Sequence, residues 1–343
     1  MKEKKKVKLL AKEFGIKVKR STSTYKGVHQ VELKNGQRLC LKKISYPIKR
    51  LRWIDSVLQQ IRQEGFGNLA WRNAQKSYGK KLFVRLDPKS PPYALMPWIK
   101  GRWPNPLSLE DMKRCGETLA HFHLAGKSIK PEAEKSVNKL QTWTGELEGK
   151  KQLLAQKIKS AIQHEKKSGL AHFFNKNQAE ILQYATQSSA LLASSPYQEE
   201  CRKPYTQVCH GDGGPSNFIF TSSQVYLIDF ETLRLDLPAY DLYRVIYNSC
   251  KDYGWNFAIA EAILNGYHSV VKLKPIDLEL AKVWLRFPRT IELLFKKWPK
   301  TAHQKRKLLK QYKRALGVER KMGDFLSRLD QYGEKLKPTR RLR

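Results

Sequence analysis

The sequence predicts an α+β protein of two lobes, a small lobe built on an antiparallel sheet and a larger helical lobe. Two patterns lead to this prediction: apolar–polar alternation with hairpin signals in roughly the first hundred residues, and helical spacing of apolar residues after Pro97. A loop-and-strand segment at 207–228 interrupts the helices. The expected lobes are residues 1–97 and 98–343. The 41% of hydrophobic residues are enough for a sizeable core, which excludes disorder as the main state.

The first lobe is expected to contain a hairpin, a helix and two further strands. Lys34-Asn35-Gly36 is a hairpin turn signal, and a helix is expected from 49 to 64, closed by Gly65. The run DPKSPP predicts a turn between the last two strands. The four expected strands cover residues 28–33, 38–44, 82–86 and 93–96.

The second lobe is expected to be mostly helical. Ser108 is a plausible cap for a helix that keeps Met112, Cys115, Leu119 and Phe122 on one face. Two amphipathic helices are expected within 150–193, and helical patterns resume at 239. Sites in two-lobed proteins tend to lie in the cleft between the lobes.

The segment between residues 210 and 231 carries the chemistry. Asp212 and Asn217 are separated as in the H-R-D-x-x-x-x-N catalytic loop of protein kinases, and an apolar strand ends at Asp229, twelve residues after Asn217. A hairpin between them brings Asn217 and Asp229 together. Amide and carboxylate oxygens are the ligands that Mg²⁺ prefers, and Asp212 can accept the proton of an attacking hydroxyl.

These residues lie within HGDGGPSNF, YLIDFE and LPAYDL, which resemble the motif of the aminoglycoside phosphotransferase and choline kinase superfamily. The resemblance implies a protein-kinase-like fold with ATP and Mg²⁺ as cofactors. It assigns Asp212 as the catalytic base, and Asn217 and Asp229 as metal ligands. It also makes His210 the residue that anchors the loop and Asp241 the residue that braces it.

Within this superfamily, IDFETLRLDLPAYDLYRVI and LRFPRTIELL are most similar to the spore-coat kinase-like proteins of the CotS type. The resemblance implies a location in the spore coat. The beginning of the chain has no apolar core of the signal-peptide kind, so synthesis in the cytoplasm is expected. No apolar run is long enough to span a membrane.

The nucleotide-binding residues are less clearly indicated by the sequence than the catalytic and metal-binding residues. The resemblance selects Lys42 to hold the α- and β-phosphates, with Lys43 as the alternative because the two point to opposite faces of the strand. The loop that would cover the phosphates, residues 21–27, lacks the kinase glycine pattern. A kinase also pairs this lysine with a helix glutamate, but Gln59 and Gln60 occupy the middle of the helix, which puts activity in doubt.

The expected hinge between the lobes is Met96-Pro97-Trp98-Ile99. A kinase-like hinge binds adenine through one carbonyl and, two residues on, one N–H. Pro97 would supply the carbonyl and Ile99 the N–H, so the donor that proline lacks is not needed. Met96, Pro97 and Ile99 are therefore the expected nucleotide-binding residues of this segment.

The charge is strongly positive and concentrated at the two ends. The chain has 66 Lys and Arg against 31 Asp and Glu, a net charge of +35. Residues 1–20 hold nine basic and two acidic residues, and residues 296–343 hold seventeen and four. Such surfaces attract polyanions, but the sequence has no zinc finger or RNP-type motif that would predict specific nucleic-acid recognition. Five scattered cysteines favour neither a zinc site nor a disulfide scaffold.

Three functions remain open from the sequence. The first is an ATP- and Mg²⁺-dependent phosphotransferase acting on a hydroxyl of a small molecule, sugar or protein. The second is a weak or inactive pseudokinase that serves as a structural coat component. The third is a basic protein that binds polyanions. The charge disfavours a cationic acceptor and favours docking to an acidic surface, such as an acidic coat protein.

Overall fold

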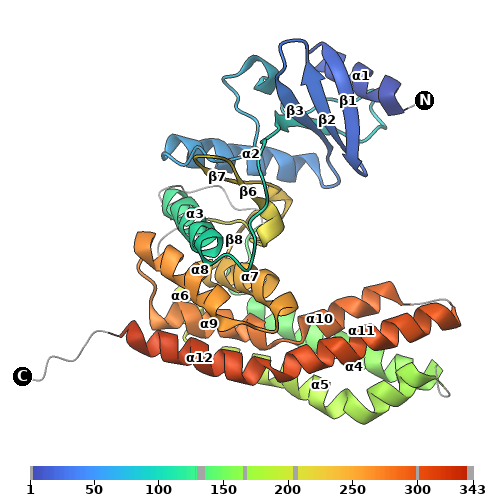
Figure 1. Ribbon diagram of the computed structural model, residues 1–343, viewed down its shortest axis with the longest axis vertical. Coiled ribbons are helices and arrows are strands. Elements are labelled where there is room, and N and C mark those ends of the chain that lie inside the picture. The colour runs from blue at the N-terminus through green and yellow to red at the C-terminus, as the bar shows by residue number, and fades with distance from the viewer. Residues whose placement is uncertain are drawn as a thin grey trace, which may run out of the picture.

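The computed structural model describes residues 3–127, 129, 136–164, 168–203, 208–298 and 301–337. A small antiparallel sheet forms one end of the molecule, and a larger assembly of helices forms the other (Figure 1). This confirms the two-lobed, kinase-like α+β fold that the sequence predicts.

The sheet of the small lobe has four strands in the order β1-β2-β3-β4, each antiparallel to the next. Alternation buries Val31, Leu39, Leu41 and Leu95 on one face, where α1 (Glu3–Glu13) covers them. The strand bounds are β1 Val18–Tyr25, β2 Val28–Leu33, β3 Arg38–Lys43 and β4 Tyr93–Pro97.

The sequence reading missed α1 and misassigned two other segments. Val7, Leu10, Ala11 and Phe14 have the helical spacing of a buried stripe, but the surrounding lysines obscured it. The proposed phosphate loop is mostly strand, because β1 continues to Tyr25. Residues 82–86 form only an isolated bridge from Val84 to Tyr93, and the continuing register sets Leu86 opposite Pro91, which has no N–H to donate.

Helix α2 (Ile48–Gln63) lies between the sheet and the helical lobe (Figure 1). It is amphipathic, and Leu51, Ile54, Val57, Leu58 and Ile61 are all fully buried. The helix therefore belongs to the core that continues into the second lobe.

The chain crosses from β4 to the helical lobe over the hairpin of β6 (Phe218–Phe220) and β7 (Val225–Leu227). Arg102 pairs with Phe220 through two backbone hydrogen bonds of 3.0 and 2.8 Å. A Cβ at Gly101 would lie 2.3 Å from the Phe220 carbonyl oxygen, so only glycine permits this close crossing.

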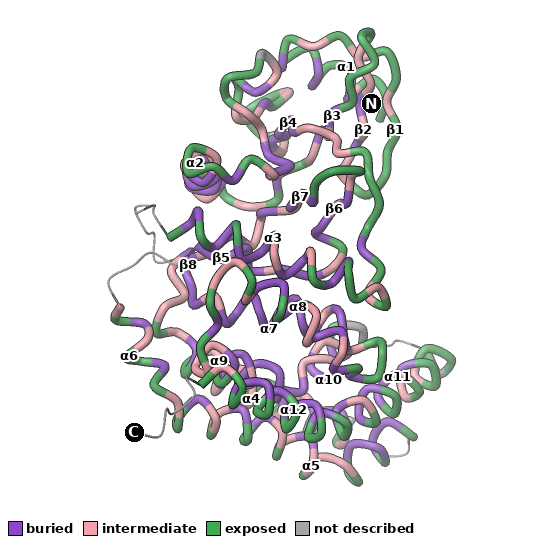
Figure 2. The backbone as a smooth tube through the Cα atoms, turned by 60° about the vertical axis from the view of Figure 1, so that its left-hand side comes forward, coloured by how far each residue is buried: buried purple, intermediate pink, exposed green. Residues whose placement is uncertain are grey.

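Helix α7 lies in the middle of the helical lobe, and most of its residues are buried (Figure 2). A short two-stranded sheet, β5 (Val208–Cys209) with β8 (Arg234–Leu235), lies beside it. None of the described helices is long and apolar enough to cross a membrane. The longer helices of this lobe are α3 Leu109–Lys127, α4 Trp143–His164, α5 Gly169–Ala193, α7 Pro238–Cys250, α8 Phe257–Val270, α9 Pro275–Arg286, α11 Ala302–Arg320 and α12 Met322–Lys335, and the shorter ones are α6 Tyr197–Cys201 and α10 Arg289–Leu294.

One buried acid makes the stability of this lobe depend on pH. The Glu319 side chain of α11 is buried, with the residue 1% exposed, and burial raises its pKa to about 8 although Arg286 of α9 opposes this. Between about pH 4.5 and pH 8 the native state keeps a proton on Glu319 that the unfolded chain releases. Stability must therefore fall as the pH rises through this window.

We expect Glu319→Gln to stabilise the protein at pH 8, by about 1–3 kcal/mol, and to change stability little at pH 5. Glutamine keeps the shape of the protonated acid and cannot ionise. Urea unfolding at the two pH values measures this, with Glu334→Gln, an exposed position on α12, as the control. A variant that is less stable than wild type at pH 8 would contradict this account of Glu319.

Candidate active site

The loop after β5 holds Asp212 at the surface of the helical lobe. It begins with Gly211, whose φ of 81° lies in the left-handed region. A Cβ there would be 2.2 Å from the Thr232 carbonyl oxygen, so both the backbone and the packing require glycine. The turn directs the following Asp212 side chain outward, where it is 40% exposed.

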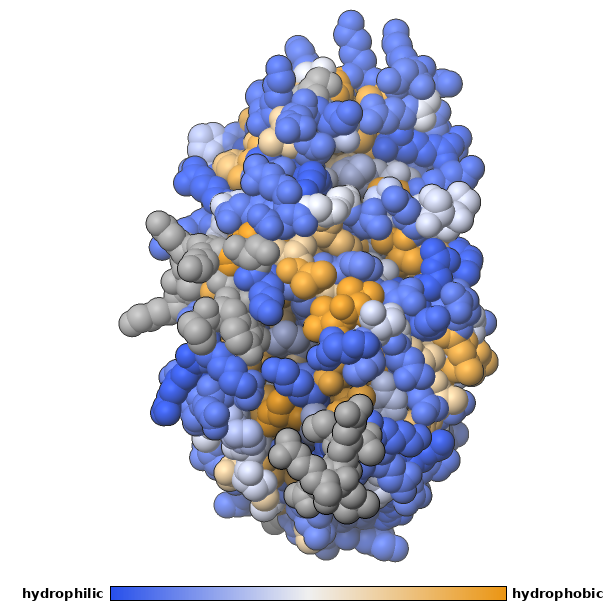
Figure 3. All heavy atoms as spheres, turned by 90° about the vertical axis from the view of Figure 1, so that its left-hand side faces the viewer, coloured by the Kyte–Doolittle hydropathy of each residue, from blue (hydrophilic) through white to orange (hydrophobic). Residues whose placement is uncertain are grey.

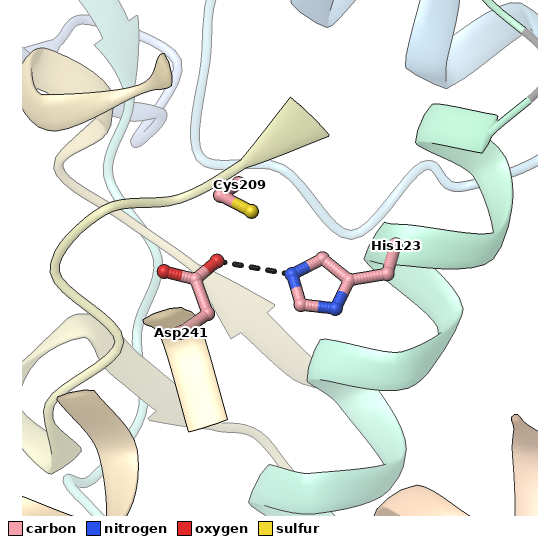
Figure 4. A group of neighbouring side chains, drawn as sticks. All are labelled: His123, Cys209 and Asp241. Carbon is pink, nitrogen blue, oxygen red and sulfur yellow. Dashed lines mark hydrogen bonds and ion pairs between the residues drawn. The ribbon is translucent and has the colours of Figure 1, made fainter. Parts of the chain in front are cut away.

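Asp241, in the first turn of α7, holds this loop from below. Its carboxylate accepts hydrogen bonds from the backbone N–H of His210 at 2.6 Å and of Gly211 at 2.8 Å. His123 of α3 contributes a third bond at 3.0 Å (Figure 4). Burial alone would raise the pKa of Asp241, but the hydrogen bonds from His123 and Gly211 outweigh it and lower the pKa. This is the contact that a loop-bracing aspartate requires.

His123, Cys209 and Asp241 are close enough together to suggest a metal site, but their contacts argue for a hydrogen-bonded brace instead (Figure 4). Both ring nitrogens of His123 are engaged, one with Asp241 and the other with the Tyr267 hydroxyl at 2.8 Å. The Cys209 thiol donates to the Asp236 carbonyl oxygen, and burial raises its pKa, which keeps it protonated. The sequence analysis did not identify the role of His123.

Arg244 of α7 forms an ion pair with the Asp212 carboxylate. Its guanidinium donates to Oδ1 of Asp212, so Oδ2 is the oxygen available for another partner. The sequence reading missed Arg244, although a signal was present. Arg244 lies three residues after Asp241, on the same helical face, and a helix that directs Asp241 to the loop directs Arg244 there as well.

The β6–β7 hairpin brings Asn217 and Asp229 to one end. The Ile228 N–H donates to the Asn217 carbonyl oxygen at 3.0 Å, directly before Asp229. Asp229 has a φ of 65°, a left-handed conformation that aspartate tolerates better than most residues. His210 supports the same segment, because its Nε2 lies 2.9 Å from the Ile228 carbonyl oxygen.

The donor set at this end fits a hard cation. The Asn217 amide nitrogen donates to the Asp212 carbonyl oxygen at 2.6 Å, which leaves the amide oxygen for a metal. The carboxylates of Asp229 and Glu231 add further oxygens. An amide oxygen with carboxylates is the chemistry that Mg²⁺ binds, so the residues present fit the ion that the sequence implies.

Lys42 reaches this group from the other lobe. Its Nζ lies 2.5 Å from Asp229 Oδ1 and 3.5 Å from Glu231 Oε2. Burial would lower the pKa of Lys42, but the two carboxylates outweigh it and raise the pKa. Lys43 is exposed and packs its side chain over Gly27, so of the two candidates only Lys42 joins the site.

No acid of α2 takes part in this contact within the described chain. Asp55 is occupied by an ion pair with Arg72 and a hydrogen bond from the Trp71 indole, and Gln59 donates to Asp55. The acidic partners of Lys42 come instead from Asp229 and Glu231 of the helical lobe. The sequence analysis considered only the helix as the source of an acidic partner for Lys42 and did not identify Glu231.

Arg50, at the beginning of α2, attaches the helix to the same segment. Its guanidinium donates to the Glu231 carbonyl oxygen at 3.1 and 2.8 Å and to that of Leu233 at 3.1 Å. Arg50 therefore links the segment after Asp229 to the small lobe through backbone atoms that any sequence would offer.

The expected hinge lies at the end of β4. Met96 and Pro97 pair with β3, and the Trp98 N–H donates to the Arg38 carbonyl oxygen at 3.2 Å. The Ile99 N–H has no backbone acceptor among the described residues. A free N–H at Ile99 and a carbonyl at Pro97 are the groups that adenine binding at this hinge would use.

Residues 27–276 match the model of a phosphotransferase enzyme family. The match covers well over half of the chain. The chain belongs to this family. The matched range includes Lys42, Asn217 and Asp229, so this cluster lies in the part of the chain that matches the phosphotransferase family.

The proteins similar to it include one sequence relative and two solved structures. The homoserine kinase of Rhizobium etli is 28% identical over 182 residues, which are 52% of this chain and 49% of that one, so the chain spans about half the length of this relative. An aminoglycoside phosphotransferase from Alicyclobacillus acidocaldarius superposes with a TM-score of 0.77 at 22% identity over 93% of both chains. A spectinomycin phosphotransferase, solved with ADP and spectinomycin, superposes with a TM-score of 0.64 at 15% identity over 93% of this chain and 98% of its own. The two structures share the fold of this chain.

We expect Asp241→Asn to lower the free energy of unfolding by about 1–3 kcal/mol, because one backbone N–H of the loop loses its acceptor in a fully buried place. Deuterium exchange at the amides of His210 and Gly211 should accelerate as well. Asp252→Asn, at an exposed aspartate, is the matched control. Unchanged exchange at both amides would show that Asp241 does not hold the loop.

Proposed function

We propose that the protein transfers the γ-phosphoryl group of ATP to a hydroxyl acceptor. The observation that carries this proposal is the meeting of Lys42 from the small lobe with Asp229 and Glu231 from the helical lobe, next to Asn217 and Asp212. Each of these groups matches a need of phosphoryl transfer: cations for phosphate, oxygens for a metal and a carboxylate for a proton.

In this proposal Asp212 is the general base. Arg244 holds Oδ1 of its carboxylate, which fixes the orientation of the side chain and leaves Oδ2 to receive the proton of the acceptor hydroxyl. Asp241 and His210 position the loop and contact no reacting atom. The rigid loop matters because a misplaced base loses much of the benefit of proximity.

Asn217 and Asp229, with Glu231 beside them, would hold Mg²⁺. The ion, when bound, neutralises charge on the phosphate oxygens. Lys42 would exchange its contact with Asp229 for the α- and β-phosphates, which frees the Asp229 carboxylate for the metal. The raised pKa of Lys42 means that it is charged at neutral pH, as this exchange needs.

We further propose residues 1–97 as the nucleotide-gripping lobe and residues 98–343 as the lobe with the catalytic and metal-binding loops. Pro97 and Ile99 would bind adenine through the backbone, with Met96 lining the pocket. The free Ile99 N–H supports this assignment.

The resemblance to CotS-type proteins supports a location in the spore coat. The net charge of +35 would favour acidic coat proteins or other polyanions as neighbours, and Figure 3 shows hydrophilic residues over most of one face. A fluorescent fusion of the protein tests this location, and its absence from the coat layer of purified spores would contradict it.

We expect Asp212→Asn to reduce phosphoryl transfer by about 10²–10⁴-fold, the range typical of losing a general base. The amide has nearly the same shape but cannot take up the proton. Calorimetry should find Mg-ATP binding close to that of wild type, because Asp212 does not hold the nucleotide. Turnover within about twofold of wild type would exclude Asp212 as the base.

We expect Lys42→Met to weaken ATP binding by about tenfold or more, because a charge-assisted contact with phosphate is lost. Lys43→Met is the matched control, since it removes the same charge one residue along the strand from an exposed side chain. ATP affinity is measured by calorimetry. If both variants lose the same affinity, the effect comes from the overall positive charge and Lys42 does not contact the phosphates specifically.

The pseudokinase alternative has one specific observation in its favour, the absence of a helix glutamate at Gln59 and Gln60. It predicts that wild type binds Mg-ATP without turnover in the presence of any acceptor. The contact of Lys42 with Asp229 and Glu231 weighs against it, because the lysine is held in place without the helix.

A further inference from the structure

A cavity of about 350 Å³ lies beside Asp212, between α7 and the segment after Asp229. This size is at the lower end of the range for small-molecule sites, roughly 300–1,000 Å³. Asp212 is the one acid among its described lining residues. The lining contains five cationic residues, namely Arg50, Lys139, Arg234, Arg244 and Arg289.

Nearby carboxylates neutralise three of these five charges. Arg244 pairs with Asp212, Arg234 pairs with Asp236, and Lys139 lies 3.5 Å from Glu146. Each of these three cations is therefore balanced within the protein.

The charges of the other two lining cations are not balanced in this way. Arg50 donates to backbone carbonyl oxygens, which accept hydrogen bonds without carrying a full charge. Arg289, the first residue of α10, has no carboxylate within ion-pair distance among the described residues. The cavity thus has a surplus of positive charge next to the proposed base.

Four of the lining cations are arginines. Guanidinium groups suit an oxyanion, because their planar arrays of N–H groups match the geometry of phosphate and carboxylate oxygens.

We propose that the acceptor is a small hydroxyl compound that carries a phosphate or carboxylate group, and that this cavity binds that group through Arg289 and Arg50. The inference rests on the proposed function. In the reaction the acceptor hydroxyl oxygen forms a bond to the γ-phosphorus of ATP, the bond from that phosphorus to the β-phosphate oxygen breaks, ADP leaves, and the hydroxyl proton passes to Asp212. A cationic acceptor would be repelled by the same lining.

The test uses four compounds of one carbon skeleton that differ in charge: glycerol 3-phosphate, glycerate, glycerol and serinol, its cationic amine. Each is titrated by calorimetry into protein saturated with Mg²⁺ and a non-hydrolysable ATP analogue, so that anions cannot occupy the nucleotide site. We expect both anions to bind about tenfold or more tightly than glycerol and serinol. If the phosphate binds more tightly than the carboxylate, the natural acceptor is a phosphate ester, and the reverse order indicates a carboxylate.

Arg289→Gln should weaken binding of glycerol 3-phosphate by about tenfold or more and leave binding of the ATP analogue unchanged. Arg306→Gln, an exposed arginine on α11, removes the same charge elsewhere and should change neither. The inference is overturned if glycerol or serinol binds as tightly as the anions, if neither anion binds at about 10 mM, or if the two variants behave alike. Failure of the ATP analogue to bind would instead remove the proposed function itself.

Discussion

The buried Asp241 carboxylate is the interaction on which the rest of the site depends. It accepts the N–H groups of His210 and Gly211, which otherwise would have no acceptor at the beginning of a tight loop. Those bonds fix the path of the chain into Asp212, and the same helix presents Arg244 to the Asp212 carboxylate one turn later. One short stretch of α7 therefore determines both the position and the ionic partner of the proposed base. His123 completes the arrangement by keeping Asp241 ionised inside the lobe.

The sequence was sufficient for the fold class because its signals are local. A hairpin turn, alternating strands and helical apolar spacing identified both lobes, and the order of Asp212, Asn217 and Asp229 located the candidate site. It failed where the determining contact is distant in the chain. Helix α1 was hidden by its lysines, since its buried stripe is visible only against the sheet that it covers. The bridge at Val84 did not extend into a strand because the next hydrogen-bonded pair would set Leu86 opposite Pro91, which has no N–H.

Two of the contacts that were missed share one property. Glu231 and Arg50 each act across elements far apart in sequence, and no spacing rule connects Lys42 to a residue 189 positions later. Arg50 moreover binds backbone carbonyl oxygens. Every residue has such an oxygen, so the residue types at these positions do not indicate the contact. Alternation alone could not decide whether Lys42 or Lys43 joins the site. The choice depends on which face of β3 is directed toward the helical lobe, and this is a property of the tertiary structure.

The acidic partners of Lys42 have a consequence for control. In protein kinases the helix glutamate makes the strand lysine depend on the position of a mobile helix, and regulation acts through that dependence. Here the described α2 offers Lys42 no acid, and Arg50 attaches this helix to the very segment that supplies Glu231. The position of Lys42 therefore does not depend on an acid of α2. The carboxylates that hold the lysine across the two lobes are the ones that would hold the metal in the proposed reaction.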